Sequence, residues 1–186
     1  MSHSRVRRED VLMWRQRHVR TFIHNDRGVA ATEFALILPL LIVLLIGTVE
    51  LGNVLLVDKK VTAASQTAAD LIAQQKVVTR TDLDNIWLAM DNILAPFSAD
   101  KTRYVALSVV SDSAGRMTID WHSTRSVTGS IPITIPPGLL GPNESIIVSG
   151  IFYDYTPVFD DFLFAAFTIS DFSYLRPRTV NAVEFR

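Results

Sequence analysis

The stretch that decides the fold is RGVAATEFALILPLLIVLLIGTVELGNVLLVDKK, residues 27–60. Residues 34–49 carry no charge, Glu50 interrupts the run, and residues 51–57 continue it uncharged. As a helix rising about 1.5 Å per residue, residues 34–57 would be roughly 36 Å long, enough to cross a hydrocarbon layer about 30 Å thick with some tilt. The sequence therefore predicts one transmembrane helix with Glu50 near its far interface.

Charge on the two sides of this segment indicates its orientation. Residues 1–27 hold seven arginines against three acidic residues, whereas residues 58–186 hold eleven basic against fourteen acidic residues. Arginine clusters stay on the cytoplasmic side, so we expect a cytoplasmic N-terminus and an exported C-terminal domain. Attraction to membrane lipid explains these arginines without a nucleic acid. A cleaved secretory signal fits less well, because its apolar region would be shorter and followed by Ala-x-Ala.

The residues just before the apolar run carry the functional signal. Gly28 has no side chain, so a protease can hold the backbone there in an extended form. Cutting the bond between Gly28 and Val29 would create an amine four residues from the carboxylate of Glu33. A carboxylate at the membrane edge is unfavourable, and such an amine, its own or a neighbour's, would offset that cost. Glu33 would then fix the axial register between adjacent helices.

Pro39 lies inside the predicted span. It has no backbone N–H, so it leaves the carbonyl of Ala35 without its helical donor and kinks or loosens the helix there. Either a mild kink is its whole effect, or the helix has to bend while it is repacked in an assembly. The residues alone leave both interpretations open.

The arginine-rich leader, the glycine, the glutamate and the transmembrane run together resemble the processing site of type IV pilin-like proteins. A prepilin peptidase cuts those proteins after the glycine, and their glutamate is fifth in the mature chain, as Glu33 is when counted from Val29. The string of residues 28–52, with its Thr-Glu-Phe-Ala-Leu, its proline and its Glu-Leu-Gly, resembles more specifically the TadE-like family, the pseudopilins of tight-adherence (Flp/Tad) pilus systems. Residues 173–178 resemble a C-terminal stretch of such proteins.

The resemblance implies a pilin-like fold and a minor pseudopilin cleaved between Gly28 and Val29, with Glu33, Phe34 and Pro39 serving assembly. Its partners would be membrane lipid, the prepilin peptidase, other pilins and pseudopilins, and the pilus assembly platform. It would lie in the bacterial inner membrane with its C-terminal domain in the periplasm, and incorporation into an extracellular pilus stays open. The alternative is an uncleaved single-pass anchor whose periplasmic domain binds a partner.

The exported part predicts an α+β fold. Residues 58–75 are alanine-rich without Gly or Pro, so the transmembrane helix should continue as a stalk. A second helix should follow, capped by Thr81, with an apolar stripe and an end at Pro96. An antiparallel sheet of about four strands should complete it. The expected strands are Tyr104–Val110, Arg116–Ser123 with Met117, Ile119 and Trp121 on one face, Glu144–Tyr155 with a bulge at Gly150, and Thr168–Leu175.

Four parts are therefore expected along the chain. They are a basic cytoplasmic leader (1–28), a transmembrane helix (29–57), a helical extension or stalk (58–78) and an extracytoplasmic α+β domain (79–186). The apolar segment 158–167 is expected to be a short helix or a tip that touches membrane or a partner.

The sequence predicts no enzyme, no cofactor, no metal site and no small-molecule substrate. The chain has no cysteine, and the exported part has one histidine, His122, expected to be solvated. Adjacent Asp160 and Asp161 would point apart on a strand, and Asp82, Asp84 and Asp91 read as capping and surface charge. No nucleophile-and-base motif accompanies them.

Overall fold

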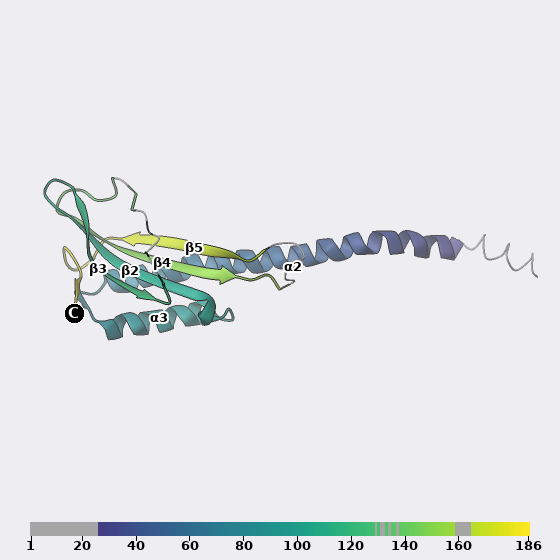
Figure 1. The fold of residues 1–186 in the computed structure, drawn as a ribbon, viewed down its shortest axis with the longest axis horizontal. Coiled ribbons are helices and arrows are strands. Elements are labelled where there is room, and N and C mark those ends of the chain that lie inside the picture. The colour runs from purple at the N-terminus through teal and green to yellow at the C-terminus, as the bar shows by residue number, and fades with distance from the viewer. Residues whose placement is uncertain (1–25, 129, 131–132, 134, 137, 159–164) are drawn as a thin grey trace, which may run out of the picture. The chain divides into compact units, whose positions relative to one another are not determined.

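The computed structural model describes residues 26–186 except 129, 131–132, 134, 137 and 159–164 (Figure 1). The chain separates into two compact units, residues 1–48 and 49–186. The helices are α2 (Asp26–Ala73), α3 (Arg80–Leu94) and the 3-10 turn η1 (Ala99–Lys101). The strands are β1 (Val77–Val78), β2 (Thr102–Ser111), β3 (Met117–Arg125), β4 (Ser145–Tyr155), β5 (Phe167–Leu175) and β6 (Glu184–Phe185).

The described part of the first unit is the N-terminal portion of α2. Its large apolar side chains from Val29 through Leu45 are exposed except Val43, which is partly buried, so this portion has no protein core of its own. By length and composition α2 can cross a membrane, and its most apolar window is entirely unburied in protein. A helix that is apolar on all sides requires an apolar surrounding, which supports membrane anchoring.

The second unit is an α+β domain, hereafter the head. Its four-stranded antiparallel sheet has the order β3-β2-β4-β5 (Figure 1). A separate two-stranded parallel pair joins β1 to β6. The predicted fold class, with a long N-terminal helix, a second helix and four antiparallel strands, is confirmed, and every predicted strand is found within two residues of its expected bounds.

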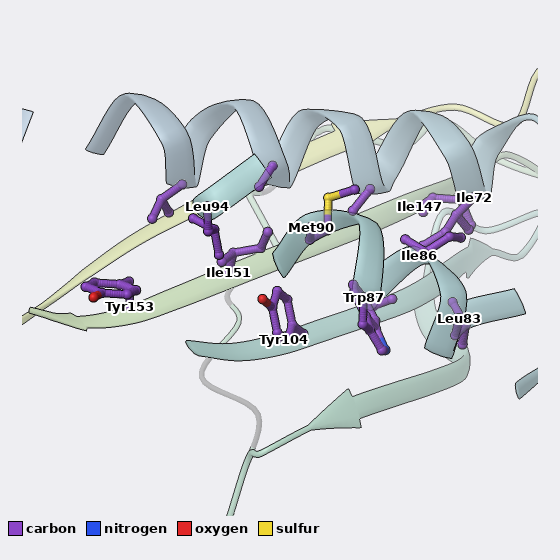
Figure 2. Packing of buried hydrophobic residues seen from close by; sticks show 14 of the residues in the cluster. Ile72, Leu83, Ile86, Trp87, Met90, Leu94, Tyr104, Ile147, Ile151 and Tyr153 are labelled. Carbon is purple, nitrogen blue, oxygen red and sulfur yellow. The ribbon is translucent and has the colours of Figure 1, made fainter. Parts of the chain in front are cut away.

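One face of the sheet packs against both helices. The stripe predicted on α3 is buried there, and the stacked rings of Trp87 and Tyr104 lie with centroids 5.2 Å apart. Figure 2 shows side chains of α2, α3 and the sheet meeting in one cluster. The members buried completely or nearly so include Val57, Val61, Ile72, Leu83, Met90, Leu94, Ile147 and Ile151.

Small residues set the distance between α2 and the sheet. Ala64, Ser65 and Ala68 are fully buried, and the hydroxyl of Ser65 donates to the carbonyl of Ser149 on β4, 3.1 Å away. A larger side chain at these positions would push the helix off the strands. The predicted apolar face of residues 58–75 therefore packs against its own domain.

The ends of α3 are fixed by polar contacts. Thr79, not Thr81, is the N-cap, and it forms a reciprocal capping box with Asp82. These hydrogen bonds hold the pKa of the Asp82 carboxyl below its usual value. At the other end the ammonium of Lys60 donates to the carbonyls of Ile93 and Ala95, at 2.8 and 2.7 Å. Thr79 has the extended backbone of an N-cap residue, whereas Thr81 already lies inside the helix.

The expectation that Met117, Ile119 and Trp121 share one face of β3 is wrong. The register between β2 and β3 shifts at Ser108 and Val109, so Trp121 lies opposite Ser108 while Ile119 lies opposite Val109. An inserted residue reverses the alternation of side chains beyond it. Trp121 is buried on the helix face and donates to the carbonyl of Val183, whereas Met117 and Ile119 are exposed on the other face.

The expected bulge at Gly150 is also wrong, because β4 keeps an unbroken register with both neighbours. Gly150 pairs with Phe172 on β5, and a Cβ at position 150 would lie 2.8 Å from the ring of Phe172. The glycine is needed because an aromatic ring covers the strand at that point.

We expect Gly150→Ala to lower the free energy of unfolding by about 1–3 kcal/mol, because the added methyl group overlaps the ring of Phe172. Urea unfolding of the full chain in detergent, followed by tryptophan fluorescence, measures this. The matched control is Gly52→Ala, where a Cβ meets nothing within 4 Å and the change should be neutral or stabilising. Equal stability of Gly150→Ala and the wild type would contradict this packing.

Candidate functional site: the N-terminal helix and a buried glutamate

The predicted cleavage bond lies in the first turns of a helix. α2 begins at Asp26, and Gly28 and Val29 are both helical and exposed. The first four N–H groups of a helix have no helical partner, and glycine weakens a helix by about 1 kcal/mol relative to alanine. The bond is therefore in a helix, and a protease that holds the backbone there in an extended form would have to unwind this turn.

The predicted assembly residues are also exposed. Glu33 and Phe34 both project from α2, and Phe34 is 58% exposed. Pro39 lies within the unbroken helical assignment of α2, so the chain tolerates it there. Among the described residues none of the ion pairs includes Glu33, and the roles of Glu33, Phe34 and Pro39 stay predictions.

Glu50 is a functional candidate whose surroundings the sequence did not reveal. Although it interrupts the apolar run, it is only 1% exposed and belongs to the head. The hydroxyl of Tyr155, at the end of β4, donates to its Oε1 at 2.6 Å. The backbone N–H of Val158 donates to both of its oxygens, at 3.1 and 3.3 Å. A carboxylate in an apolar helix is thus satisfied by residues more than a hundred positions later.

Hydrogen bonds alone stabilise this carboxylate within the described part of the chain. The six salt bridges found there do not include Glu50. Removing the Tyr155 hydroxyl would leave this buried carboxylate with the single N–H of Val158 as donor, so part of its hydrogen-bonding capacity would be lost without compensation by water. Burial of the phenol, together with its hydrogen bond to Glu50, raises the pKa of Tyr155 well above its usual value. Tyr155 therefore remains a neutral donor at physiological pH.

Asp91 is the second residue whose role was mispredicted. It is not a surface charge on α3: its side chain is 13% exposed and accepts from the hydroxyl of Tyr104 and, at 2.9 Å, from Arg125. Burial and the hydrogen bond to Asp91 raise the pKa of Tyr104. The cluster joins α3 to two strands and contains no group poised as a nucleophile, so we interpret it as structural.

The remaining candidates offer no reactive site. His122 is exposed on β3, as expected. Asp160 and Asp161, with most of the predicted tip 158–167, lie outside the described residues. Within the described ranges no three His, Cys, Asp or Glu side chains are grouped so as to hold a metal ion. The absence of catalysis stays a prediction.

The C-terminal motif of residues 173–178 fastens the head to α2. Arg178 pairs with Asp70 of α2, and its backbone N–H donates to the carbonyl of Ala73 at 2.9 Å. Arg176 binds both carboxylate oxygens of Glu144, at 2.9 and 2.7 Å. The two arginines thus clamp the end of β5 onto the helix and onto the start of β4.

The start of α2 carries an exposed glycine and an exposed glutamate, an apolar span follows, and a second glutamate stands where the head begins. Residues 28–70 match the family model described as TadE-like protein. The predicted resemblance is thereby confirmed for this segment. The TadE-like segment includes Gly28, Glu33, Pro39 and Glu50, but not Tyr155. Comparison with curated proteins and with solved structures gives no match.

Tyr155→Phe removes one of the donors to the buried carboxylate of the TadE-like segment. We expect it to lower the free energy of unfolding of the head by about 1.5–3 kcal/mol, the usual contribution of a hydrogen bond to a charged group. Glu50→Gln, which buries an amide without an acceptor, should cost about 1–3 kcal/mol. Urea unfolding of the full chain in detergent measures both.

The matched control for these variants is Glu33→Gln, because Glu33 is exposed and lies outside the head. Its effect on unfolding of the head should stay within about 0.5 kcal/mol. If Tyr155→Phe is as stable as Glu33→Gln, the hydrogen bond to Glu50 does not hold the head.

Proposed function

We propose that this protein is a minor pseudopilin of a tight-adherence pilus, cleaved after Gly28 on the cytoplasmic side of the inner membrane. The TadE-like match over residues 28–70 supports a role in such a pilus system. The mature chain would begin at Val29 and carry its head into the periplasm. The protein would be a substrate of the prepilin peptidase and not itself an enzyme.

The length of the span supports this proposal. Between Val29 and Val49 the chain offers 21 residues before Glu50 enters the head. As a helix they measure about 31 Å, close to the roughly 30 Å of a bilayer core. Cleavage after Gly28 would therefore leave a mature chain in which the membrane segment begins at once and the folded head follows it directly.

The two glutamates of α2 differ in a way that favours a role for Glu33 between subunits. Glu50 has its donors within its own chain, whereas Glu33 is exposed and, among the described residues, has no hydrogen-bond donor. A carboxylate at the membrane edge requires a partner, and the new amine of Val29, its own or a neighbour's, is the nearest one that cleavage would supply.

The second candidate is an uncleaved membrane anchor with a partner-binding periplasmic head. It is favoured by one observation: Gly28 and Val29 lie inside α2 and not in an extended segment. The two candidates predict different N-termini for the protein recovered from cells.

The first test is therefore the N-terminus. In cells with an active pilus system we expect Val29 as the first residue, and Gly28→Val should leave the chain full length because a branched side chain blocks close backbone approach. N-terminal sequencing or intact-mass measurement shows this. The control Gly52→Val, in the same helix, should be cut like the wild type. A wild-type chain that retains residues 1–28 would favour the anchor.

The second test addresses Glu33. Glu33→Ala should be cut normally yet appear in the sheared pilus fraction at about one-tenth of the wild-type amount or less, the effect of losing about 1.4 kcal/mol of pairing energy. Glu33→Asp, which keeps the carboxylate, should restore part of the signal. Quantitative immunoblotting of sheared pili and membranes measures both. Normal incorporation of Glu33→Ala would show that the carboxylate does not guide assembly.

A further inference from the structure

The head has an apolar surface at the end where Glu50 is held. Val158 is 67% exposed although its N–H is bound to Glu50, and the exposed ring of Phe167 contacts Tyr155 with centroids 5.5 Å apart. Both residues therefore lie at the same end of the head as Glu50. The sheet ends there, because Tyr155 and Phe167 are paired at the end of β4 and the start of β5.

A second apolar surface lies on the outward side of α2. Successive residues of a helix are turned by about 100°, so Leu55 lies roughly opposite the side that holds Glu50 and Val57. Leu51 and Leu56 flank Leu55 on this outward side. All three leucines are exposed, while Val57 is completely buried in the head. The exposed apolar residues of α2 end there, since Asp58 and Lys59 follow and are exposed.

We propose that both apolar surfaces, one formed by Val158 and Phe167 and the other by Leu51, Leu55 and Leu56, dock into the interfacial layer of the lipid bilayer. All five residues belong to the head. The occupant is lipid because the three leucines belong to the same helix as the candidate membrane span and come directly after its most apolar part. The inference goes beyond the proposed function; it rests on the span and not on cleavage after Gly28.

Helix length supports lipid as the occupant. From Val29 to Leu56 the chain has 28 residues, or about 42 Å as a helix. That matches the roughly 40–45 Å of a bilayer with its headgroups, whereas the portion before Glu50 matches the hydrocarbon core alone. The leucines on the outward side of α2 would thus lie in the headgroup layer. Val158 and Phe167 would enter the same layer on the other side of the helix.

Charge at the edge of the surface indicates what drives docking. Lys59 and Lys101 are exposed there, but so are their neighbours Asp58 and Asp100. Among the described residues at this edge the two signs balance, so burial of apolar side chains and not attraction to anionic lipid drives the contact there.

The chain has no cysteine, so single-cysteine variants can carry an environment-sensitive fluorophore. The full chain is reconstituted in phosphatidylcholine vesicles at a low protein-to-lipid ratio. Val158→Cys and Leu55→Cys report on the surface, and Leu88→Cys is the matched control, since Leu88 is a 59% exposed leucine on α3 of the same head. Leu41→Cys reports on the span.

We expect the labels at positions 158 and 55 to be quenched by lipids carrying a shallow nitroxide and shielded from aqueous iodide. The label at position 88 should show the reverse. Iodide quenching at position 158 equal to that at position 88 would overturn the proposal. Shielding that disappears when lipid dilutes the protein would also overturn it, because a second copy would then be the occupant.

The label at position 41 tells whether a negative result means that the surface does not dock or that α2 does not span the membrane. Quenching there by deep nitroxides, with none at position 158, retains the span and overturns the docking. Absence of deep quenching at position 41 overturns both. Circular dichroism of each labelled variant confirms that the head is folded.

Discussion

The carboxylate of Glu50 needs donors wherever it lies in an apolar setting, and the head supplies them through Tyr155 and Val158. An ionised group without such partners would be too costly to bury. This requirement ties a residue in the middle of α2 to the far end of β4, more than a hundred residues away. It marks where α2 becomes part of the head.

Packing on the two sides of Glu50 follows from that constraint. Before it, most of the large apolar side chains of α2 are exposed, which favours a lipid surrounding. After it, Val57, Val61 and Ile72 are buried against the sheet, and small residues allow close approach. Near the C-terminal end of α2, Arg178 pairs with Asp70 and so holds the chain after β5 against the helix. One helix therefore has two environments: an apolar surrounding before Glu50 and the core of the head after it.

Much of this arrangement could be predicted because it is encoded locally. The apolar run predicted a membrane span, and the alternation of apolar and polar residues predicted the strands. The apolar stripe of α3 predicted which side of that helix is buried. What could not be predicted depends on distant partners. The shift at Ser108 reverses β3, Phe172 rather than a bulge explains Gly150, and Asp91 is held by two strands. Glu50 drew attention as a charge in an apolar run, yet nothing near it in sequence names Tyr155.

The site shows the same division. Gly28, Glu33 and Pro39 could be proposed from spacing and resemblance, because the predicted processing signal is short and linear. The second glutamate became interpretable only with the fold, since its donors come from the sheet. In this account Glu33 and Glu50 have different duties: the first awaits a partner outside the folded chain, and the second holds the head to its own helix.

Amide hydrogen exchange at Val158 tests this account most directly. Val158 lies in no helix or strand and its side chain is exposed, so without Glu50 its N–H should exchange like that of an open loop. In the full chain in lipid nanodiscs, the account predicts strong protection of this amide and loss of that protection in Glu50→Ala. An amide that exchanges at the rate of an unstructured peptide in the wild type would contradict it.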